Sequence, residues 1–325
     1  MKIAILDDYQ DVVRTLSVFD KLKGHDVTIF NDHTKDTDAL ARRLKEAEAV
    51  CLIRERTPIR APLIERLPKL RLISQRSVYP HIDVDACTRR GIVLCSDMHP
   101  GKPSYGTAEL TWGLVIAAMR RIPQEMASLK AGRWQSTVGT GLRGRTLGVF
   151  GYGRIGGVVA GYGRAFGMKV LVWGRERTAA QARADGYDVA PSKQAFFEQS
   201  DVLTLHLRST PDTHGIVTRE DLGRMKTTAL LVNTSRAALI EPGALVEALK
   251  AGRPGTAAVD VFEEEPVLGG DHPLLKMDNV VCTPHLGYVL RDGYEEMFKA
   301  IFDQVLAFAS GKPVNVVNPD ALRAR

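Results

Sequence analysis

The segment RTLGVFGYGRIGGVVAG, residues 145–161, constrains the fold more than any other part of the chain. Its glycines Gly151, Gly153 and Gly156 stand in G-x-G-x-x-G spacing. The apolar run before them predicts a strand, the run after them a helix, and KVLVW, residues 169–173, a second strand. In such a unit the glycines allow a tight turn, close approach of the backbone to a pyrophosphate, and packing of helix on strand. We therefore expect a Rossmann-type domain whose helix N-terminus faces the phosphates of a dinucleotide.

Short apolar runs alternate with amphipathic helical patterns along most of the chain. In the first hundred residues we expect strands at MKIAIL, HDVTIF, AVCLI, LRLIS and GIVLCS, and a second series begins at RTLGVF and continues through KVLVW, DVLTLHL, ALLVNTS, AAVDVF and NVVCTPH. Strand and helix in alternation predict parallel sheets that are covered on both faces.

A long apolar helix, expected over residues 103–121, separates the two series and is too short to cross a membrane. The last helical pattern, GYEEMFKAIFDQVLAFASG, is expected to pack back on the first domain. We therefore predict an α/β fold with two doubly wound parallel-sheet domains. The first is flavodoxin-like and comprises residues 1–101 and 287–325, and the second is a Rossmann domain over residues 102–286.

The composition places the chain among soluble globular proteins. Hydrophobic residues make up 44% and charged residues 25% of its 325 residues, and no apolar run reaches the length of a membrane span. Its four cysteines lack C-x-x-C spacing, which argues against a disulfide frame or a zinc site, so we expect a cytoplasmic protein without a metal. The net charge of +6 comes from scattered arginines with acids between them. Nucleic-acid and membrane binding are therefore not expected, and a mildly positive field around an anion-binding cleft fits better.

The second strand of the Rossmann unit ends without the usual acid. A carboxylate at this place would bind the adenosine ribose and repel a 2′-phosphate, whereas here Gly174 and Arg175 follow the strand. Arg175 offers a planar charged fork suited to phosphate, and Arg177 stands close by. We therefore favour NADP over NAD. The alternative is that Arg175 is a surface residue and Glu176 supplies the acid for NAD.

Three later strands are each followed by a polar residue: Arg236 in LVNTSRAALIE, Asp260 and Glu265 in AAVDVFEEEP, and His285 in CTPHLG. Hydride transfer at an alcohol carbon needs a base for the hydroxyl proton, and histidine titrates in the right range. A carboxylate on the second ring nitrogen would fix the tautomer, and an arginine can bind a substrate carboxylate through two parallel bonds. His206 competes for the histidine role, but no acid is evident beside it.

The motifs GYGRIG, NTSRAALIE, DVFEEEP and TPHLG, in this order, strongly resemble the D-isomer-specific 2-hydroxyacid dehydrogenases. The resemblance covers essentially the whole chain, including LIRERT and HIDVDACTRRGI in the first domain. It implies Arg236 as the clamp for the substrate carboxylate and carbonyl, His285 as acid and base, and Glu265 as its partner. It also implies a homodimer through the nucleotide-binding domain, with the long helix and the segment MASLKAGRW at the interface.

The pattern and the resemblance together define the expected contacts. The expected nucleotide-binding residues are Gly151, Gly153, Arg154, Ile155, Gly156, Arg175, His206, Thr234, Asp260 and Gly287. The expected substrate-binding residues are Arg54, Ser77, Val78, Arg236 and Tyr288.

The chain also departs from the family pattern. The first-domain loop, which usually carries glycines whose N–H groups bind the substrate carboxylate, reads QRSVYPHID. Tyr288 places a bulky ring where the family has a second glycine after the histidine. HLRST replaces HLPLT, so that Arg208 could share a 2′-phosphate with Arg175. Arg54 matches a position that meets the far end of the substrate in phosphoglycerate enzymes, which permits an anionic distal group.

These features predict an NAD(P)-dependent dehydrogenase for a D-2-hydroxyacid or the matching 2-keto acid. Hydroxypyruvate, glyoxylate and 3-phosphoglycerate stay open as substrates, as does the physiological direction. One alternative is a dinucleotide-sensing interaction protein, since the resemblance extends to corepressors on the same fold. Formate oxidation is disfavoured because that chemistry places glutamine, not Glu265, beside the histidine.

Overall fold

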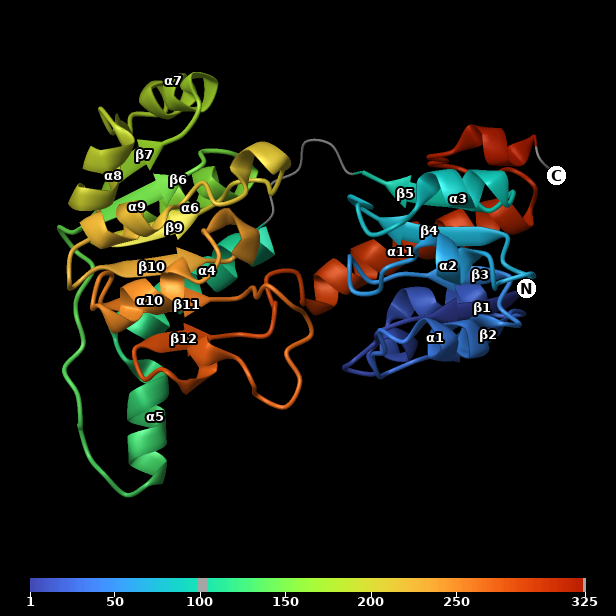
Figure 1. Ribbon diagram of the computed structural model, residues 1–325, viewed down its shortest axis with the longest axis horizontal. Helices are drawn as coiled ribbons and strands as arrows, with labels where there is room; N and C mark the ends of the chain where they lie inside the picture. The colour runs from blue at the N-terminus through green and yellow to red at the C-terminus, as the bar shows by residue number, and fades with distance from the viewer. Residues whose placement is uncertain (99–104, 324–325) are drawn as a thin grey trace. The chain divides into compact units, whose positions relative to one another are not determined.

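The computed structural model describes residues 1–98 and 105–323, and the chain divides into two compact units (Figure 1). Unit 1 comprises Met1–Pro100 and Leu290–Arg325, and unit 2 comprises Gly101–Val289. Each unit is built on one parallel sheet with helices against it, which is the predicted fold class.

Unit 1 contains a five-stranded sheet in the order β2-β1-β3-β4-β5. Its strands are β1 (Lys2–Ile5), β2 (Asp26–Ile29), β3 (Ala49–Cys51), β4 (Leu72–Arg76) and β5 (Val93–Asp97). Its α-helices are α1 (Thr37–Leu44), α2 (Ala61–Ile64), α3 (Val84–Arg89) and α11 (Arg291–Ala309). The last helix, α11, packs on β4, where the hydroxyl of Ser74 donates to the carbonyl of Ile301 at 2.9 Å. The closing helix therefore belongs to unit 1.

Unit 2 contains a seven-stranded sheet in the order β12-β11-β10-β9-β6-β7-β8. Its strands are β6 (Thr146–Phe150), β7 (Lys169–Trp173), β8 (Asp188–Val189), β9 (Val202–Leu205), β10 (Leu230–Asn233), β11 (Thr256–Val259) and β12 (Val280–Cys282). Its α-helices are α4 (Tyr105–Met119), α5 (Ile122–Lys130), α6 (Arg154–Ala165), α7 (Glu176–Ala184), α8 (Lys193–Gln199), α9 (Arg219–Arg224) and α10 (Ala244–Lys250). The strand order reverses between β6 and β9, and such a switch point is where open α/β sheets bind ligands.

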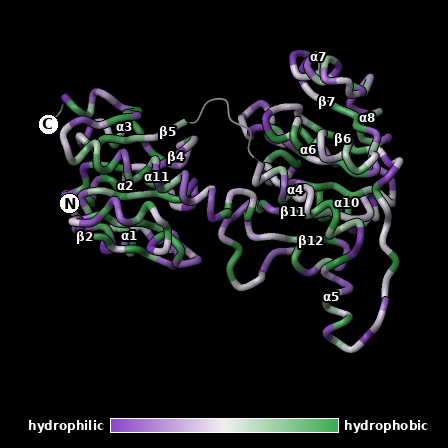
Figure 2. Tube along the Cα trace, turned by 180° about the vertical axis from the view of Figure 1, so that it is seen from behind, coloured by the Kyte–Doolittle hydropathy of each residue, from purple (hydrophilic) through white to green (hydrophobic). Residues whose placement is uncertain are grey.

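The strands of unit 2 are apolar on both faces because helices cover the sheet from both sides. Leu147 and Val149 of β6 pack in one core with α4 and α6, whereas Phe150 packs in a second core with Phe196 and Phe197 of α8. Figure 2 shows the central strands as largely hydrophobic and the helices as mixed. This burial on two faces explains why the strands appear as continuous apolar runs in the sequence.

The helix predicted over residues 103–121 is present in the structure as α4. Residues 103 and 104 lie outside the described residues, α4 ends at Met119, and α5 begins at Ile122 in a new direction. Between them Arg121 adopts a left-handed conformation with φ 53°, and Pro123 lies in the first turn of α5. Proline lacks the N–H that a continuing helix would use and is tolerated in a first turn, so the chain restarts instead of extending α4. Helix α5 and the short edge strand β8 were not predicted.

Among the described residues, no helix combines the length and the apolar character needed to span a bilayer. Within the same residues, no group of three or more His, Cys, Asp or Glu side chains is placed to hold a metal ion.

Candidate active site at the carboxyl edge of the seven-stranded sheet

Three neighbouring strands bring the predicted catalytic residues to one edge of the sheet. In the register of β10, β11 and β12, Asn233 pairs with Val259, and Val259 pairs with Cys282. These strands therefore end at the same level. Arg236, Asp260 and His285 each follow one of the three strand ends within three residues, and Glu265 follows Asp260 in the same loop.

Glu265 and His285 form a hydrogen-bonded pair. Oε2 of Glu265 lies 2.5 Å from Nδ1 of His285, and Oε1 accepts from the backbone N–H of Phe262 at 3.0 Å. A carboxylate partner at Nδ1 holds the proton of the ring on that nitrogen and leaves Nε2 for another group. The predicted partnership of this acid and this histidine is thus present as geometry.

The environment keeps Glu265 ionised. Burial opposes its charge, but the hydrogen bond and charge of His285, the N–H of Phe262 and the charge of Arg236 outweigh that effect. The pKa of Glu265 is therefore lowered from its ordinary value. The contribution of Arg236 places its guanidinium in the electrostatic range of the pair.

Asp260 organises the turn that carries His285. Oδ1 accepts from the hydroxyl of Thr283 at 2.6 Å and from the N–H of Leu286 at 2.7 Å, and Oδ2 accepts from the N–H of Gly287 at 2.9 Å. His285 itself adopts a left-handed conformation with φ 52°, which is sparsely populated by residues other than glycine. The carboxylate thus fastens both sides of a strained turn.

Burial of the Asp260 carboxylate disfavours its charged form. Its side chain is fully buried, and burial raises its pKa in spite of the three hydrogen bonds that favour the charged form. All three of these hydrogen bonds go to the turn that carries His285.

Helix α4 also contacts the turn that carries His285, and these contacts were not predicted from the sequence. The hydroxyl of Thr107 donates to the carbonyl of Gly287 at 2.9 Å, and Thr111 shares a hydrogen bond of 2.7 Å with the predicted nucleotide contact Thr234. The signal in the sequence was the pair of threonines four positions apart in an apolar helix, a spacing that places them on one face.

Arg236 is held by the turn that follows β10. The side chain of Asn233 donates to the carbonyl of Arg236 at 2.9 Å and accepts from the N–H of Ser235 at 3.0 Å. The guanidinium of Arg236 donates to the carbonyl of Ser235 at 2.7 Å. Beside the acid–base pair, the ring of Tyr288 meets His285 edge to face with centroids 5.3 Å apart.

The glycine motif forms a cradle at the end of β6. A Cβ on Gly156 would lie 2.1 Å from the carbonyl oxygen of Gly151, and one on Gly151, which has φ 96°, would lie 2.8 Å from that of His206. Both positions therefore require glycine for packing. A Cβ on Gly153 would meet nothing within 4 Å, so the chain itself leaves open space there, as close approach of a pyrophosphate requires. The residues present fit a dinucleotide, with Arg154, Ile155 and Gly156 in the first turn of α6.

His206 directly follows β9, next to the first glycine of the cradle. Neither of its ring nitrogens has a hydrogen-bond partner among the described residues, and burial lowers its pKa to about 3. It is therefore a neutral side chain and is not placed as the acid–base group. The part of His206 that lies beside Gly151 is its backbone carbonyl, not its ring.

The end of β7 carries no acid in the described structure. A Cβ on Gly174 would come within 2.8 Å of the hydroxyl of Thr178, so a side chain at this position would require that hydroxyl to move. Glu176, the alternative acid, pairs with Arg183 at 2.9 Å on the surface of α7. Arg175 and Arg208 are both exposed and follow the ends of β7 and β9.

The remaining predicted residues belong to unit 1. Arg54 follows β3 and Ser77 and Val78 follow β4, and these strands are neighbours in the sheet. Arg54 and Ser77 both adopt left-handed conformations, with φ 58° and φ 83°. Two strained residues at adjacent carboxyl ends indicate a functional edge in this sheet as well.

A glycine cradle, an acid-paired histidine and an arginine at one edge of a Rossmann sheet define an NAD(P)-dependent dehydrogenase. A family model described as "D-isomer specific 2-hydroxyacid dehydrogenase, NAD binding domain" matches residues 112–287. The chain therefore belongs to the D-isomer-specific 2-hydroxyacid dehydrogenase family, and it is an enzyme that acts on CH–OH groups.

Relatives agree with this membership over most of the chain. A glyoxylate reductase of Aeropyrum pernix is 36% identical over 93% of this chain and 92% of its own length. A D-3-phosphoglycerate dehydrogenase of Methanocaldococcus jannaschii is 36% identical over 98% of this chain, which spans 59% of that protein. The crystal structure of a candidate D-3-phosphoglycerate dehydrogenase from Ralstonia solanacearum superposes with a TM-score of 0.95 at 52% identity, over 99% of this chain and 98% of that one. These names are those of enzymes, so the interaction-protein alternative is not favoured.

Proposed function

We propose that the protein reduces a 2-keto acid to the D-2-hydroxyacid, or catalyses the reverse reaction, with His285 as acid and base and Arg236 as the clamp for the substrate carboxylate. The observation that carries the proposal is the hydrogen bond between Glu265 and His285 at the edge that also bears the glycine cradle. The predicted cytoplasmic location stays a prediction.

The nicotinamide nucleotide, when bound, supplies the hydride for the carbonyl carbon. Arg236 binds the substrate carboxylate and polarises the neighbouring carbonyl, because its fork can make two parallel bonds. The imidazolium of His285 donates the proton on Nε2 to the carbonyl oxygen in the reductive direction and regains it in the oxidative direction. Glu265 stays ionised and stabilises the imidazolium, and Asp260 keeps the histidine turn in place.

We place the nucleotide at the cradle, with Gly151, Gly153, Arg154, Ile155, Gly156, His206, Thr234, Asp260 and Gly287 as its neighbours. We propose a preference for NADP over NAD. Gly174 supplies no acid at the end of β7, and Glu176 is paired with Arg183. Arg175, assisted by Arg208, is then the group that binds a 2′-phosphate.

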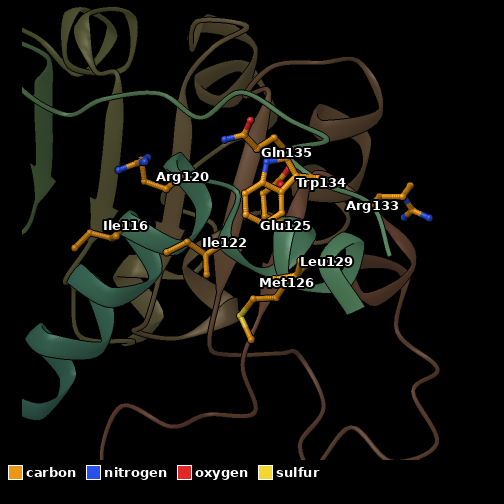
Figure 3. A pocket seen from close by; sticks show the side chains of 9 residues that line it. All are labelled: Ile116, Arg120, Ile122, Glu125, Met126, Leu129, Arg133, Trp134 and Gln135. Carbon is orange, nitrogen blue, oxygen red and sulfur yellow. The ribbon is translucent and has the colours of Figure 1, made fainter. Parts of the chain in front are cut away.

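A homodimer through unit 2 is part of the proposal. Helix α5 and the segment after it project from the unit (Figure 1) and border an open hollow of about 450 Å³. Its lining combines the apolar Ile116, Ile122, Met126, Leu129 and Trp134 with the polar or charged Arg120, Glu125, Arg133 and Gln135 (Figure 3). Trp134 is 77% exposed and Leu129 is 58% exposed at this hollow. Large side chains left exposed together on a projecting element favour contact with a second copy of the chain.

The substrate class follows from the relatives and from Arg54. Relatives named glyoxylate reductase and D-3-phosphoglycerate dehydrogenase suggest a small 2-keto acid, or one with a distal anion that Arg54 would meet. A panel of glyoxylate, hydroxypyruvate, pyruvate and 3-phosphohydroxypyruvate, each assayed with NADPH and with NADH, tests the proposal. We expect steady oxidation of NADPH with at least one keto acid. No turnover with any of them would contradict the proposed activity.

A further inference from the structure

The loop after β4 is anchored by the side chain of Gln75. Its Nε2 donates to the carbonyl of Ser77 at 2.7 Å, to the carbonyl of Val78 at 3.3 Å and to the hydroxyl of Ser96 at 2.8 Å. The hydroxyl of Ser96 in turn donates to the carbonyl of Ser77 at 2.6 Å. Gln75 is fully buried, so these bonds form away from competing water.

Anchoring two carbonyls determines where two N–H groups point. In a trans peptide the C=O of one residue and the N–H of the next face opposite ways. The carbonyls of Ser77 and Val78 face Gln75, so the N–H groups of Val78 and Tyr79 face away from it. Neither N–H donates to any group in residues 1–98 or 105–323. Two successive free N–H groups form a concavity that binds anions.

The same loop lacks the glycines that the family pattern carries there. Ser77 holds φ 83°, a conformation that glycine adopts without strain and serine does not. The N–H of Ser77 donates to the carbonyl of Asp97 at 2.8 Å, and its carbonyl accepts from Gln75 and Ser96. Side-chain hydrogen bonds thus impose the conformation that glycines would otherwise permit.

We infer that Gln75 is a positioning residue that presents the N–H groups of Val78 and Tyr79 to the carboxylate of the 2-keto acid. This inference rests on the proposed function. It assigns specificity for the charged carboxylate to a side chain that does not itself touch the substrate.

The test compares glyoxylate with methyl glyoxylate, whose ester carries no negative charge. Gln75→Met keeps the length of the side chain and removes both of its donors. We expect KM for glyoxylate to rise by about tenfold or more, the effect of one hydrogen bond to a charged group. KM for the ester, kcat and the affinity for NADPH should change little. Ser96→Ala removes the second donor to the carbonyl of Ser77. It should also raise KM for glyoxylate, but by a smaller factor.

Gln304→Met is the matched control, since Gln304 is an equally buried glutamine whose amide does not bond the loop carbonyls. It should lower Tm without selective loss of glyoxylate binding. Equal rises of KM in the Gln75 and Gln304 variants, or equal rises for acid and ester, would overturn the inference. An inactive wild-type enzyme would instead contradict the proposed function, so the two failures are distinguishable.

Discussion

Nδ1 of His285 lies 2.5 Å from Oε2 of Glu265, twenty positions away in the chain. The two residues come from different loops at one sheet edge, so their contact is created by the fold. A carboxylate at this nitrogen stabilises the imidazolium form that the reductive reaction consumes.

Glu265→Gln should move the pH dependence of keto-acid reduction. The pKa of the wild-type Glu265 carboxyl is lowered from 4.5, so the group stays charged above that pH and its favourable contribution is lost only as pH falls through the lowered value. Removing the charge destabilises the imidazolium. The pH at which the reductive kcat/KM declines should therefore shift downward in the variant.

The control for this experiment is Glu263→Gln. Glu263 pairs with His272 at 3.0 Å on the surface, which is the same kind of pair outside the site. Its loss should leave the pH profile unchanged. An unshifted profile in Glu265→Gln would mean that the carboxylate does not act on His285.

Asp260→Asn should lower kcat by loosening the histidine turn. An amide nitrogen in place of Oδ2 would face the N–H of Gly287, so that one buried bond is replaced by two opposed donors at a cost of about 1–3 kcal/mol. Both kcat and Tm should fall. Asp221→Asn, at a buried carboxylate that closes the first turn of α9 far from the site, should lower Tm alone. A similar loss of kcat in both variants would remove the special role of Asp260.

Arg175→Asp should reverse the nucleotide preference. The new carboxylate repels a 2′-phosphate and offers acceptors to ribose hydroxyls, so KM for NADPH should rise and KM for NADH should fall. Lys169→Asp makes the same change of charge at the exposed opposite end of β7 and should leave the ratio of the two KM values nearly unchanged. If the NADPH preference survives in Arg175→Asp, Arg175 does not bind the phosphate.

Trp134→Ser should weaken self-association. Trp134 lines the hollow beside α5 (Figure 3), and its large exposed ring is the kind of side chain that anchors an interface. Sedimentation velocity should show a dimer for the wild type and a shift toward monomer for the variant. Leu268→Ser, also an exposed apolar residue of unit 2 but outside the hollow, is the control. Two wild-type-like dimers would place the interface elsewhere.

The sequence was sufficient for every strand except β8 and for the glycine turn after β6, because their signals are local. Apolar runs such as KVLVW are buried on both faces, and Gly151 and Gly156 are required by contacts within a few residues or with the adjacent strand. The end of the long helix was predicted within two residues, whereas α5 was not predicted, because its short sequence IPQEMASLK lacks a strong apolar periodicity.

The hydrogen bonds that hold the site residues in place could not be predicted from motifs. The three bonds of Asp260 depend on the register of β11 and β12, which brings Thr283 and Gly287 to its carboxylate. The anchoring of Ser77 by Gln75 depends likewise on a side chain that turns back on its own loop. Pairwise geometry of this kind appears only when the strands are placed, and the roles assigned to Arg236, Glu265 and His285 stay predictions until they are tested.

The most direct test of the account is single-turnover reduction of a keto acid by His285→Ala, with NADPH affinity measured on the same preparation. His272→Ala, at the histidine of the surface pair, is the matched control. The account predicts that the rate of the chemical step falls by about 10²–10⁴-fold in His285→Ala, while NADPH binds as tightly as to the wild type. A chemical step of wild-type rate in that variant would contradict the account.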